Sequence, residues 1–279
     1  MGNLFSGLDE FGLGELSKLK VYGDAEKKNQ KKAKPKIDPK VIEKDVLFDK
    51  TYLCPVCDRE FRAKTIKTGR VKLVGTDTDL RPKYKIVDPL KYDAVACPHC
   101  GYAAISRFFR NITPSQIALV KKNVSENFKG LEKNDDIYSY DDAIIRHKLA
   151  LANSIVKKSK TSERAYTCLK TAWVIRGKRE SLSRNMQDNK KQVKTLLREE
   201  LGFILNAYEG FEEAYSKESF PMCGMDEVTV NLLVAELARR VGKNDEAGRW
   251  ISQILISKDA NERIKERARD IRDLIRKSK

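Results

Sequence analysis

Two Cys-x-x-Cys motifs constrain the fold of this chain more than any other feature of its sequence. Cys54 and Cys57 lie in Cys-Pro-Val-Cys, and Cys97 and Cys100 lie in Cys-Pro-His-Cys. A spacing of two residues lets both sulfurs of a pair, and nearby backbone amides, turn toward one ion. Two matched pairs therefore predict one tetrahedral zinc site. The 39 residues between the pairs are a modest penalty, because the cost of loop closure grows only logarithmically with length.

Four thiolates leave no coordination position open for an activated water, so the predicted zinc ion is structural. His99 lies between the two ligands of the second motif and could replace one of them, although such a histidine is more commonly a surface residue of the turn. Gly101 follows the second motif, where a residue that adopts positive φ completes the turn. Asp58 has the same place after the first motif and tolerates that conformation less well.

The second motif also permits redox chemistry. Cys-Pro-His-Cys is the active-site motif of some disulfide oxidoreductases, in which the cysteine lies at a helix N-terminus and its thiolate is stabilised. A strand is predicted before this motif, and a helix over 103–109 is compatible with the sequence after it. That fold needs a βαβ context, whereas the rest of the chain has helical periodicity, and it leaves the first motif unexplained. Zinc binding is the preferred interpretation, with redox catalysis as its alternative.

The length and the N-terminal sequence predict a two-part protein in the cytoplasm. A chain of 279 residues is long enough for two folded units. It has no run of about 18 apolar residues that would span a membrane. Residues 1–20 are apolar but contain three acidic residues and lack the early positive charge of a signal peptide. They predict a hydrophobic tag that docks on a protein or membrane surface, followed to residue 45 by a lysine-rich linker.

The net charge of +16 favours acidic partners such as nucleic acid, acidic proteins or anionic lipid, without choosing among them. Positive charge is concentrated at 27–36 and 176–198, and both segments are predicted to be solvated linkers or turns. Within 46–110, alternation of Val and Thr with Lys and Arg predicts short strands. Residues 75–92 read as a long irregular loop, in which Asx turns by Asp77 and Asp79 are preferred over a cation or phosphate site.

From 111 to 279 the apolar spacing is helical. Thr113 and Pro114 predict the start of a helix over 114–129, and a second helix should begin near Tyr140, with His147 as a structural residue beside its apolar face. Cys168 is expected in the core. Cys223 lies in a loop and is the one thiol expected to have any reactivity, but no catalytic base accompanies it, so enzymatic activity is not expected.

Three stretches of the helical part, ERAYTCLKTA, LNAYEGFEEA and DEAGRWISQI, share a pattern. Each has a small residue, a large residue four positions later and another apolar residue three positions after that. This is the packing face of the second helix in tetratricopeptide-like pairs. An ordinary helical bundle is the alternative. The residues concerned are Ala165, Leu169, Ala172, Ala207, Phe211, Ala214, Ala247, Ile251 and Ile254.

Several segments together resemble one bacterial family. They are NLFSGLDEFGLG, the region around YLCPVC with its TDTDLRP sequence, DPLKYDAVACPHCGYAA and ELARRVGKNDEAGRW. The chain is similar in these to the bacterial domain-of-unknown-function family 2225. The resemblance implies a zinc-ribbon region joined to tetratricopeptide-like helices in a cytoplasmic protein without established activity. It also implies that the four cysteines of the two motifs are the family's motif cysteines.

The sequence therefore predicts an α+β chain with three parts: an N-terminal tag and linker (1–45), a zinc-ribbon-like module (46–110) and a tetratricopeptide-like helical domain (111–279). Its predicted role is that of a non-enzymatic scaffold or adaptor for protein partners. The alternative is RNA binding by the basic zinc module. In that case the groups that stack on bases would be Tyr84, Tyr92, Tyr102 and Phe108.

Overall fold

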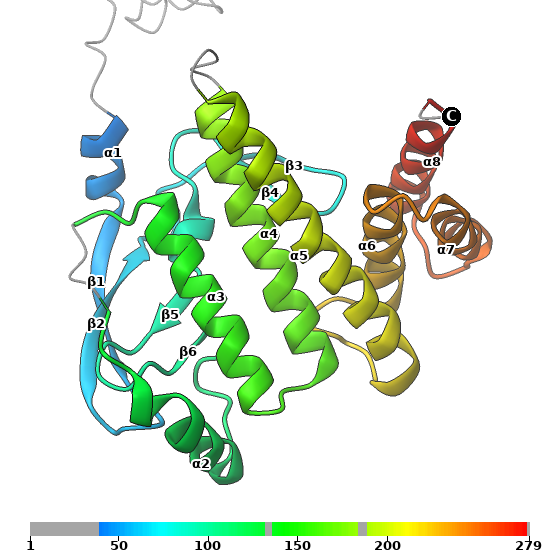
Figure 1. Cartoon of the computed structure of the whole chain (residues 1–279). Coiled ribbons are helices and arrows are strands. Elements are labelled where there is room, and N and C mark those ends of the chain that lie inside the picture. The colour runs from blue at the N-terminus through cyan, green and yellow to red at the C-terminus, as the bar shows by residue number, and fades with distance from the viewer. Residues whose placement is uncertain (1–38, 132–135, 184–188, 278–279) are drawn as a thin grey trace, which may run out of the picture. The chain divides into compact units, whose positions relative to one another are not determined.

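The computed structural model describes residues 39–131, 136–183 and 189–277 of the chain (Figure 1). The predicted hydrophobic tag and most of the predicted linker lie outside the described residues. The last part of that linker is helical, since α1 runs over Pro39–Asp45. Ordered structure thus starts before Val46, where the sequence analysis placed its beginning.

Strands precede the main helices along the chain. The strands are β1 (Leu47–Leu53), β2 (Glu60–Ile66), β3 (Leu73–Thr76), β4 (Pro82–Tyr84), β5 (Ala94–Ala96) and β6 (Ala103–Ile105). The helices that follow are α2 (Pro114–Asn123), α3 (Tyr140–Val156), α4 (Thr161–Ser183), α5 (Lys190–Lys217), α6 (Glu227–Arg240), α7 (Asn244–Ile256) and α8 (Glu262–Lys277). Two 3-10 turns, η3 (Pro89–Tyr92) and η4 (Ser125–Asn127), complete the described elements. The predicted α+β class is confirmed.

The six strands form three antiparallel pairs, β1–β2, β3–β4 and β5–β6. In the first pair Tyr52 lies opposite Phe61, and both side chains are buried while their neighbours along the strands are exposed. This is the period-two alternation that the sequence predicts. The predicted irregular loop over 75–92 is partly regular, because it contains β4 and η3.

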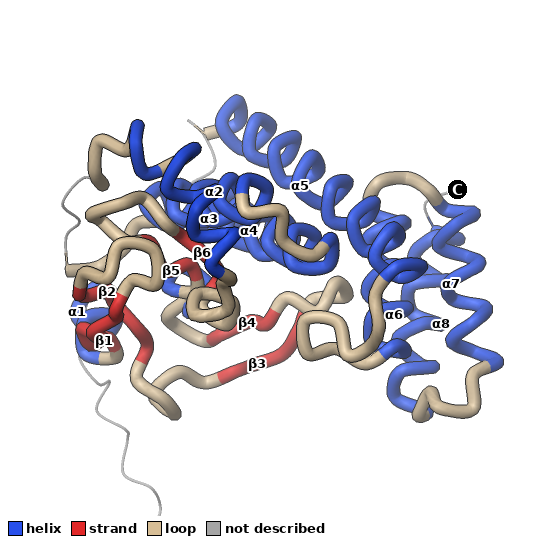
Figure 2. Tube along the Cα trace, turned by 90° about the horizontal axis from the view of Figure 1, so that it is seen from below, coloured by secondary structure: helices blue, strands red, loops and turns tan. Residues whose placement is uncertain are grey.

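The β5–β6 pair is buried on both faces. All six residues of its strands are buried, and α3 packs across the pair (Figure 1, Figure 2). Asn153 of α3 donates a hydrogen bond from Nδ2 to the carbonyl oxygen of Gly101 at 3.0 Å, which ties the helix to the turn of this hairpin. Burial on both faces explains why the strands are short apolar runs without polar alternation.

The first helices after the strands begin where the sequence places their caps. Thr113 forms a capping box with Gln116 at the start of α2, and Ser139 forms one at the start of α3. The helix predicted over 114–129 is shorter than expected, because α2 ends at Asn123 and gives way to η4. The predicted start of the next helix near Tyr140 is confirmed.

The two longest helices, α4 and α5, pack along each other. Gly210 of α5 permits this approach, since a Cβ atom there would lie 2.8 Å from the Cβ atom of Ala165 on α4. The prediction that residues 176–198 form a solvated linker is wrong for the part of this range that the structure describes. Its residues continue α4 as far as Ser183 and start α5 at Lys190.

All nine residues of the three similar stretches are buried in one helical core, so their predicted packing role is confirmed. The first stretch lies on α4 and the second on α5, which are neighbours within one helix pair. The third lies on α7, which packs against α6. The first two stretches therefore do not occupy equivalent places in successive pairs, and tetratricopeptide-like pairing stays a prediction.

A cluster of buried charges anchors the loop between β3 and β4 to the helices. Asp79 has no exposed surface. Arg176 of α4 binds both of its carboxylate oxygens, with Nη2 at 2.5 Å from Oδ2 and Nη1 at 3.1 Å from Oδ1. The same guanidinium contacts Asp77 at 3.1 Å and, through Nε, Glu200 of α5 at 2.6 Å. These four residues are named the Asp79 cluster.

Further bonds connect the same loop to α6 and α8. Thr78 donates a hydrogen bond to Glu236 of α6 at 2.6 Å, and Glu236 is itself fully buried. Arg267 of α8 donates to the carbonyl oxygen of Asp77 at 3.1 Å. The loop therefore contacts α4, α6 and α8 directly, and Arg176 links it to Glu200 of α5. Asx-type bonding is present but secondary, since Asp79 also accepts a hydrogen bond of 3.5 Å from the backbone of Arg81.

The arginine controls the ionisation of the buried carboxylate. Burial alone would raise the pKa of Asp79, but the hydrogen bonds and charge of Arg176 outweigh burial and hold that pKa below its ordinary value of 3.8. The unfolded chain therefore binds this proton more readily than the folded chain does. The contribution of Asp79 to stability is present above about pH 4 and is lost as the pH falls through the folded pKa.

Replacing the arginine tests this anchoring. Arg176→Met should lower the free energy of unfolding by about 3 to 5 kcal/mol, because it leaves buried carboxylates without a partner. Urea unfolding at neutral pH measures the change. Arg269→Met is the matched control, since Arg269 makes a solvent-exposed ion pair with Glu262 on α8, and it should change stability far less. Equal effects of the two substitutions would contradict the anchoring role.

Candidate metal centre

The first Cys-x-x-Cys motif forms the turn between β1 and β2. The backbone amide of Asp58 donates to the carbonyl oxygen of Cys54 at 3.0 Å, and the amide of Cys54 donates to the carbonyl oxygen of Arg59 at 3.0 Å. These bonds close the turn and bring both cysteines to its inner side. Asp58 completes it with a φ of 56°.

The second motif builds the same turn between β5 and β6. The amide of Gly101 donates to the carbonyl oxygen of Cys97 at 3.1 Å, and the amide of Cys97 donates to Tyr102 at 2.8 Å. Gly101 has a φ of 73°, as the sequence predicts. Asp58, at the corresponding position of the first motif, adopts the same left-handed conformation despite its side chain. Two equivalent hairpin turns thus present two cysteines each.

The turns meet, and their four sulfur atoms form one cluster. Cys54, Cys57, Cys97 and Cys100 place their Sγ atoms within 4.8 Å of one another, and these residues could hold a metal ion. Two of the sulfur pairs join different motifs at short range, with 3.6 Å from Cys54 to Cys100 and 3.7 Å from Cys57 to Cys97. His99 is exposed and is not part of the cluster.

Contacts among the sulfurs shift the pKa values of Cys97 and Cys100 in opposite directions. Hydrogen bonds from Cys100 and Cys54 lower the pKa of Cys97 to about 2, and contacts with Cys54 and Cys97 raise the pKa of Cys100. Without a cation the cluster therefore favours one thiolate supported by neighbouring thiols. A divalent metal ion replaces the thiol protons and allows every sulfur to be a thiolate ligand.

The structure does not have the features of the redox alternative. The helix compatible with 103–109 is replaced by strand β6 and turns, so Cys97 does not lie at the start of a helix. All six described cysteines are free thiols.

A group of aromatic side chains packs against the two cysteine turns. Tyr52 and Phe61 of the first hairpin stack with ring centroids 5.7 Å apart, and Phe109 packs edge-on against both. Tyr102, from the second hairpin, lies 5.1 Å from Phe109 by ring centroids and donates its hydroxyl to the Phe109 carbonyl oxygen at 3.0 Å. The metal-ligand residues and this aromatic group belong to one buried cluster. The position of each turn is therefore fixed by packing as well as by its own hydrogen bonds.

The other singled-out residues lie away from this cluster. His147 is fully buried, its Nδ1 is 2.7 Å from the carbonyl oxygen of Ala143, and burial lowers its pKa to about 4. Burial raises the pKa of Cys168 to about 12 and that of Cys223 to about 11. The thiol of Cys223 donates to the carbonyl oxygen of Ser162 at 3.3 Å. The reactivity expected for Cys223 is therefore opposed by its surroundings.

The sequence analysis missed the buried role of Arg176. It placed this residue in a basic linker, but its side chain is buried in the Asp79 cluster. The sequence feature that could have revealed this role is TDTDLRP. Its two acidic residues occur in an otherwise basic region, and buried acidic residues need positively charged partners. Asp77 and Asp79 are compensated by arginine, so the cluster is built as an ionic anchor.

These features define a class of protein: an α+β chain in which two cysteine turns bring together four sulfurs that could hold a metal ion, beside a helical region. The family model described as "Uncharacterized protein conserved in bacteria (DUF2225)" matches residues 47–275, and the chain belongs to that family. Comparison with curated proteins gives no match, and comparison with solved structures gives none either. Among the described residues, no helix is long and apolar enough to cross a membrane.

The geometry of the second turn can be tested at its glycine. Gly101→Ala should lower the free energy of unfolding of the metal-loaded protein by at least about 1 to 2 kcal/mol, the cost of the left-handed conformation for a residue with a side chain. A clash adds to it, since the new Cβ atom would lie 2.6 Å from the ring of Phe128. Urea unfolding at constant zinc concentration measures the effect.

Gly248 of α7 supplies the control. A Cβ atom there meets nothing within 4 Å, so Gly248→Ala should stabilise the protein slightly through helix propensity. Similar stability changes for the two substitutions would show that the turn places no special demand on Gly101.

Proposed function

We propose that the four cysteines bind zinc and that the ion is structural. A Zn–S bond of about 2.3 Å in a tetrahedron places neighbouring sulfurs about 3.8 Å apart. The distances of 3.6 Å from Cys54 to Cys100 and 3.7 Å from Cys57 to Cys97 support this geometry, and soft thiolate ligands favour zinc over hard cations. Four protein ligands leave no site for a bound water, which supports a structural role over a catalytic one.

The placement of the cluster supports a large effect of the ion on folding. It links two hairpins, each of which would be marginal alone because two-stranded hairpins have little stability in water. Zinc binding in small modules contributes on the order of 10 kcal/mol. Asn153 of α3 donates a hydrogen bond to the carbonyl oxygen of Gly101, so an ion that fixes the second turn would also restrain α3.

The function proposed for the whole chain is that of a cytoplasmic, non-enzymatic scaffold for protein partners. The observation that carries this proposal is the combination of a sulfur cluster that joins two hairpins with grooves on the helices. One groove of about 260 Å³ is lined by α3, α4 and α5, and another of about 440 Å³ by the ends of α5, α6 and α7. Asp77 and Asp79, the acidic residues that could have suggested catalysis, both form ion pairs with Arg176.

The RNA-binding alternative loses most of its support. It required exposed aromatic side chains for stacking on bases. Tyr92 and Tyr102 are buried, and Tyr84 and Phe108 are only half-exposed. The net charge of +16 remains compatible with RNA binding, so RNA is included as a competing outcome below.

Metal content tests the zinc proposal. Elemental analysis of protein purified without chelator should give about one zinc per chain. Cys54→Ser should lose the metal and melt at a much lower temperature, because one ligand is removed from the site. Cys223→Ser is the control and should keep both the zinc and the stability. Retained zinc in the Cys54 variant, or insulin reductase activity of the wild-type protein, would contradict a structural zinc site.

Partner recovery tests the scaffold proposal. The tagged chain should be isolated from bacterial cells after brief crosslinking, with half of the sample treated with nuclease before mass spectrometry. We expect specific proteins that survive nuclease treatment. If the recovered partners disappear together with RNA, the chain is an RNA-binding protein and the scaffold proposal is wrong.

A further inference from the structure

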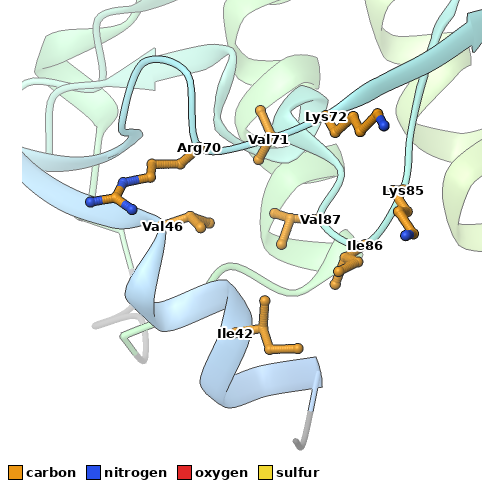
Figure 3. A pocket seen from close by; sticks show the side chains of 8 residues that line it. All are labelled: Ile42, Val46, Arg70, Val71, Lys72, Lys85, Ile86 and Val87. Carbon is orange, nitrogen blue, oxygen red and sulfur yellow. The ribbon is translucent and has the colours of Figure 1, made fainter. Parts of the chain in front are cut away.

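A small apolar groove lies between α1 and the two extended segments that flank the β3–β4 hairpin (Figure 3). Its volume is about 90 Å³. The backbone amide of Lys85 donates to the carbonyl oxygen of Lys72 at 3.1 Å, which holds the two segments together. The lining residues are Ile42, Val46, Arg70, Val71, Lys72, Lys85, Ile86 and Val87.

The centre of the groove is aliphatic. Figure 3 shows its five apolar side chains gathered between α1 and the extended segments. Val87 is buried and forms part of the floor, whereas Ile86 is 57% exposed at the edge. Apolar surface of this kind is stabilised when a partner covers it.

The rim of the groove is basic. Arg70, Lys72 and Lys85 are all exposed, and none of them has an ion-pair partner among the residues that the structure describes. Lys83, two residues before Lys85, differs from the rim residues because it pairs with Asp77 at 2.5 Å. The three rim residues therefore favour a partner with negative charge.

The strand beside the groove has a free edge. Among the described residues β3 pairs with β4 alone, and every residue of β3 is exposed. Leu73 and Val74, which directly follow the rim residue Lys72, are 53% and 56% exposed. The free edge of such a strand, flanked by exposed apolar side chains, can accept an extended segment through backbone hydrogen bonds.

We propose that this groove and the free edge of β3 bind an extended protein segment in which acidic residues alternate with apolar ones. Alternation suits the site because successive side chains of an extended segment point to opposite sides. The apolar residues would cover the aliphatic centre, and the acidic residues would face Arg70, Lys72 and Lys85. This inference rests on the proposed scaffold function and assigns the chemistry of one partner segment to one surface.

The groove favours a protein segment over other acidic ligands. Its lining contains no aromatic side chain, so it lacks a platform on which RNA bases would stack. Val87 at the centre of the lining is buried, and a buried side chain does not insert into a lipid surface as outward-projecting apolar side chains do. RNA and anionic lipid are therefore outcomes that would contradict the proposal.

Fluorescence anisotropy with the full chain tests the proposal. The probe is a short labelled peptide of alternating glutamate and valine, compared with a lysine–valine peptide and a glutamate–serine peptide. We expect saturable binding of the glutamate–valine probe alone. Its affinity should fall as salt is added, because the rim charges are exposed.

Two variants locate the binding site. The double substitution Lys72→Glu and Lys85→Glu should weaken binding of the probe about tenfold or more, because attraction at the rim becomes repulsion. Ile86→Asp should weaken it through the apolar centre. The control Lys121→Glu with Lys122→Glu reverses two exposed charges on α2 and should change affinity by less than about twofold. Circular dichroism melts confirm that each variant is folded.

Several results would overturn the assignment. The first is equal binding of all three peptides, and the second is unchanged binding of the glutamate–valine probe after the rim substitutions. The third is tighter binding of RNA or phosphatidylglycerol vesicles than of the probe, if the rim substitutions abolish that binding. Self-association that Ile86→Asp abolishes in sedimentation equilibrium would assign the groove to a second copy of the chain. If crosslinked partners and zinc content are retained in the rim variant while probe binding is absent from the wild type, only the groove assignment fails. The scaffold proposal would then stand.

Discussion

Short hairpins cannot hold themselves together, and this constraint shapes the whole N-terminal half. The β1–β2 and β5–β6 pairs each have two strands and no further neighbour among the described residues, so neither builds a sheet with its own core. Their turns instead converge on four sulfurs, and an aromatic group that includes Tyr52 and Phe109 fills the space beneath them. A cation at the sulfurs would remove the proton competition within the cluster and fix both turns at once.

The β3–β4 hairpin is stabilised by a different means. It lies between the two cysteine motifs in sequence but contributes no ligand to the cluster. The Asp79 cluster ties its loop to α4 and α5, with further bonds to α6 and α8. Buried ion pairs often contribute less to stability than apolar packing would, but they are demanding about geometry. The cluster therefore specifies where the loop docks more than it increases the total stability.

Short-range sequence patterns predicted much of this structure. The features that they missed depend on contacts between residues far apart in the sequence. The spacing of Cys54 and Cys57 and its repetition identified the sulfur cluster, and the spacing from Ala165 to Leu169 identified a packing face. Arg176 was misread because a window of basic residues does not show that one of them faces a buried carboxylate 97 positions earlier. The groove beside β3 was also invisible in the sequence, since α1 and two separated segments line it.

The position of Arg176 has a consequence for how the chain is made. A ribosome completes the loop that contains Asp79 long before it reaches α4, and α8, which also contacts the loop, is made after α4 and α5. During synthesis the acidic loop must remain in water, because no arginine is yet available to accompany it into the interior. The two cysteine turns can close as soon as Cys100 has emerged, so the metal centre can assemble early on the nascent chain. The ionic anchor can close only after α4 and the start of α5 have been made, so it assembles later than the cysteine turns.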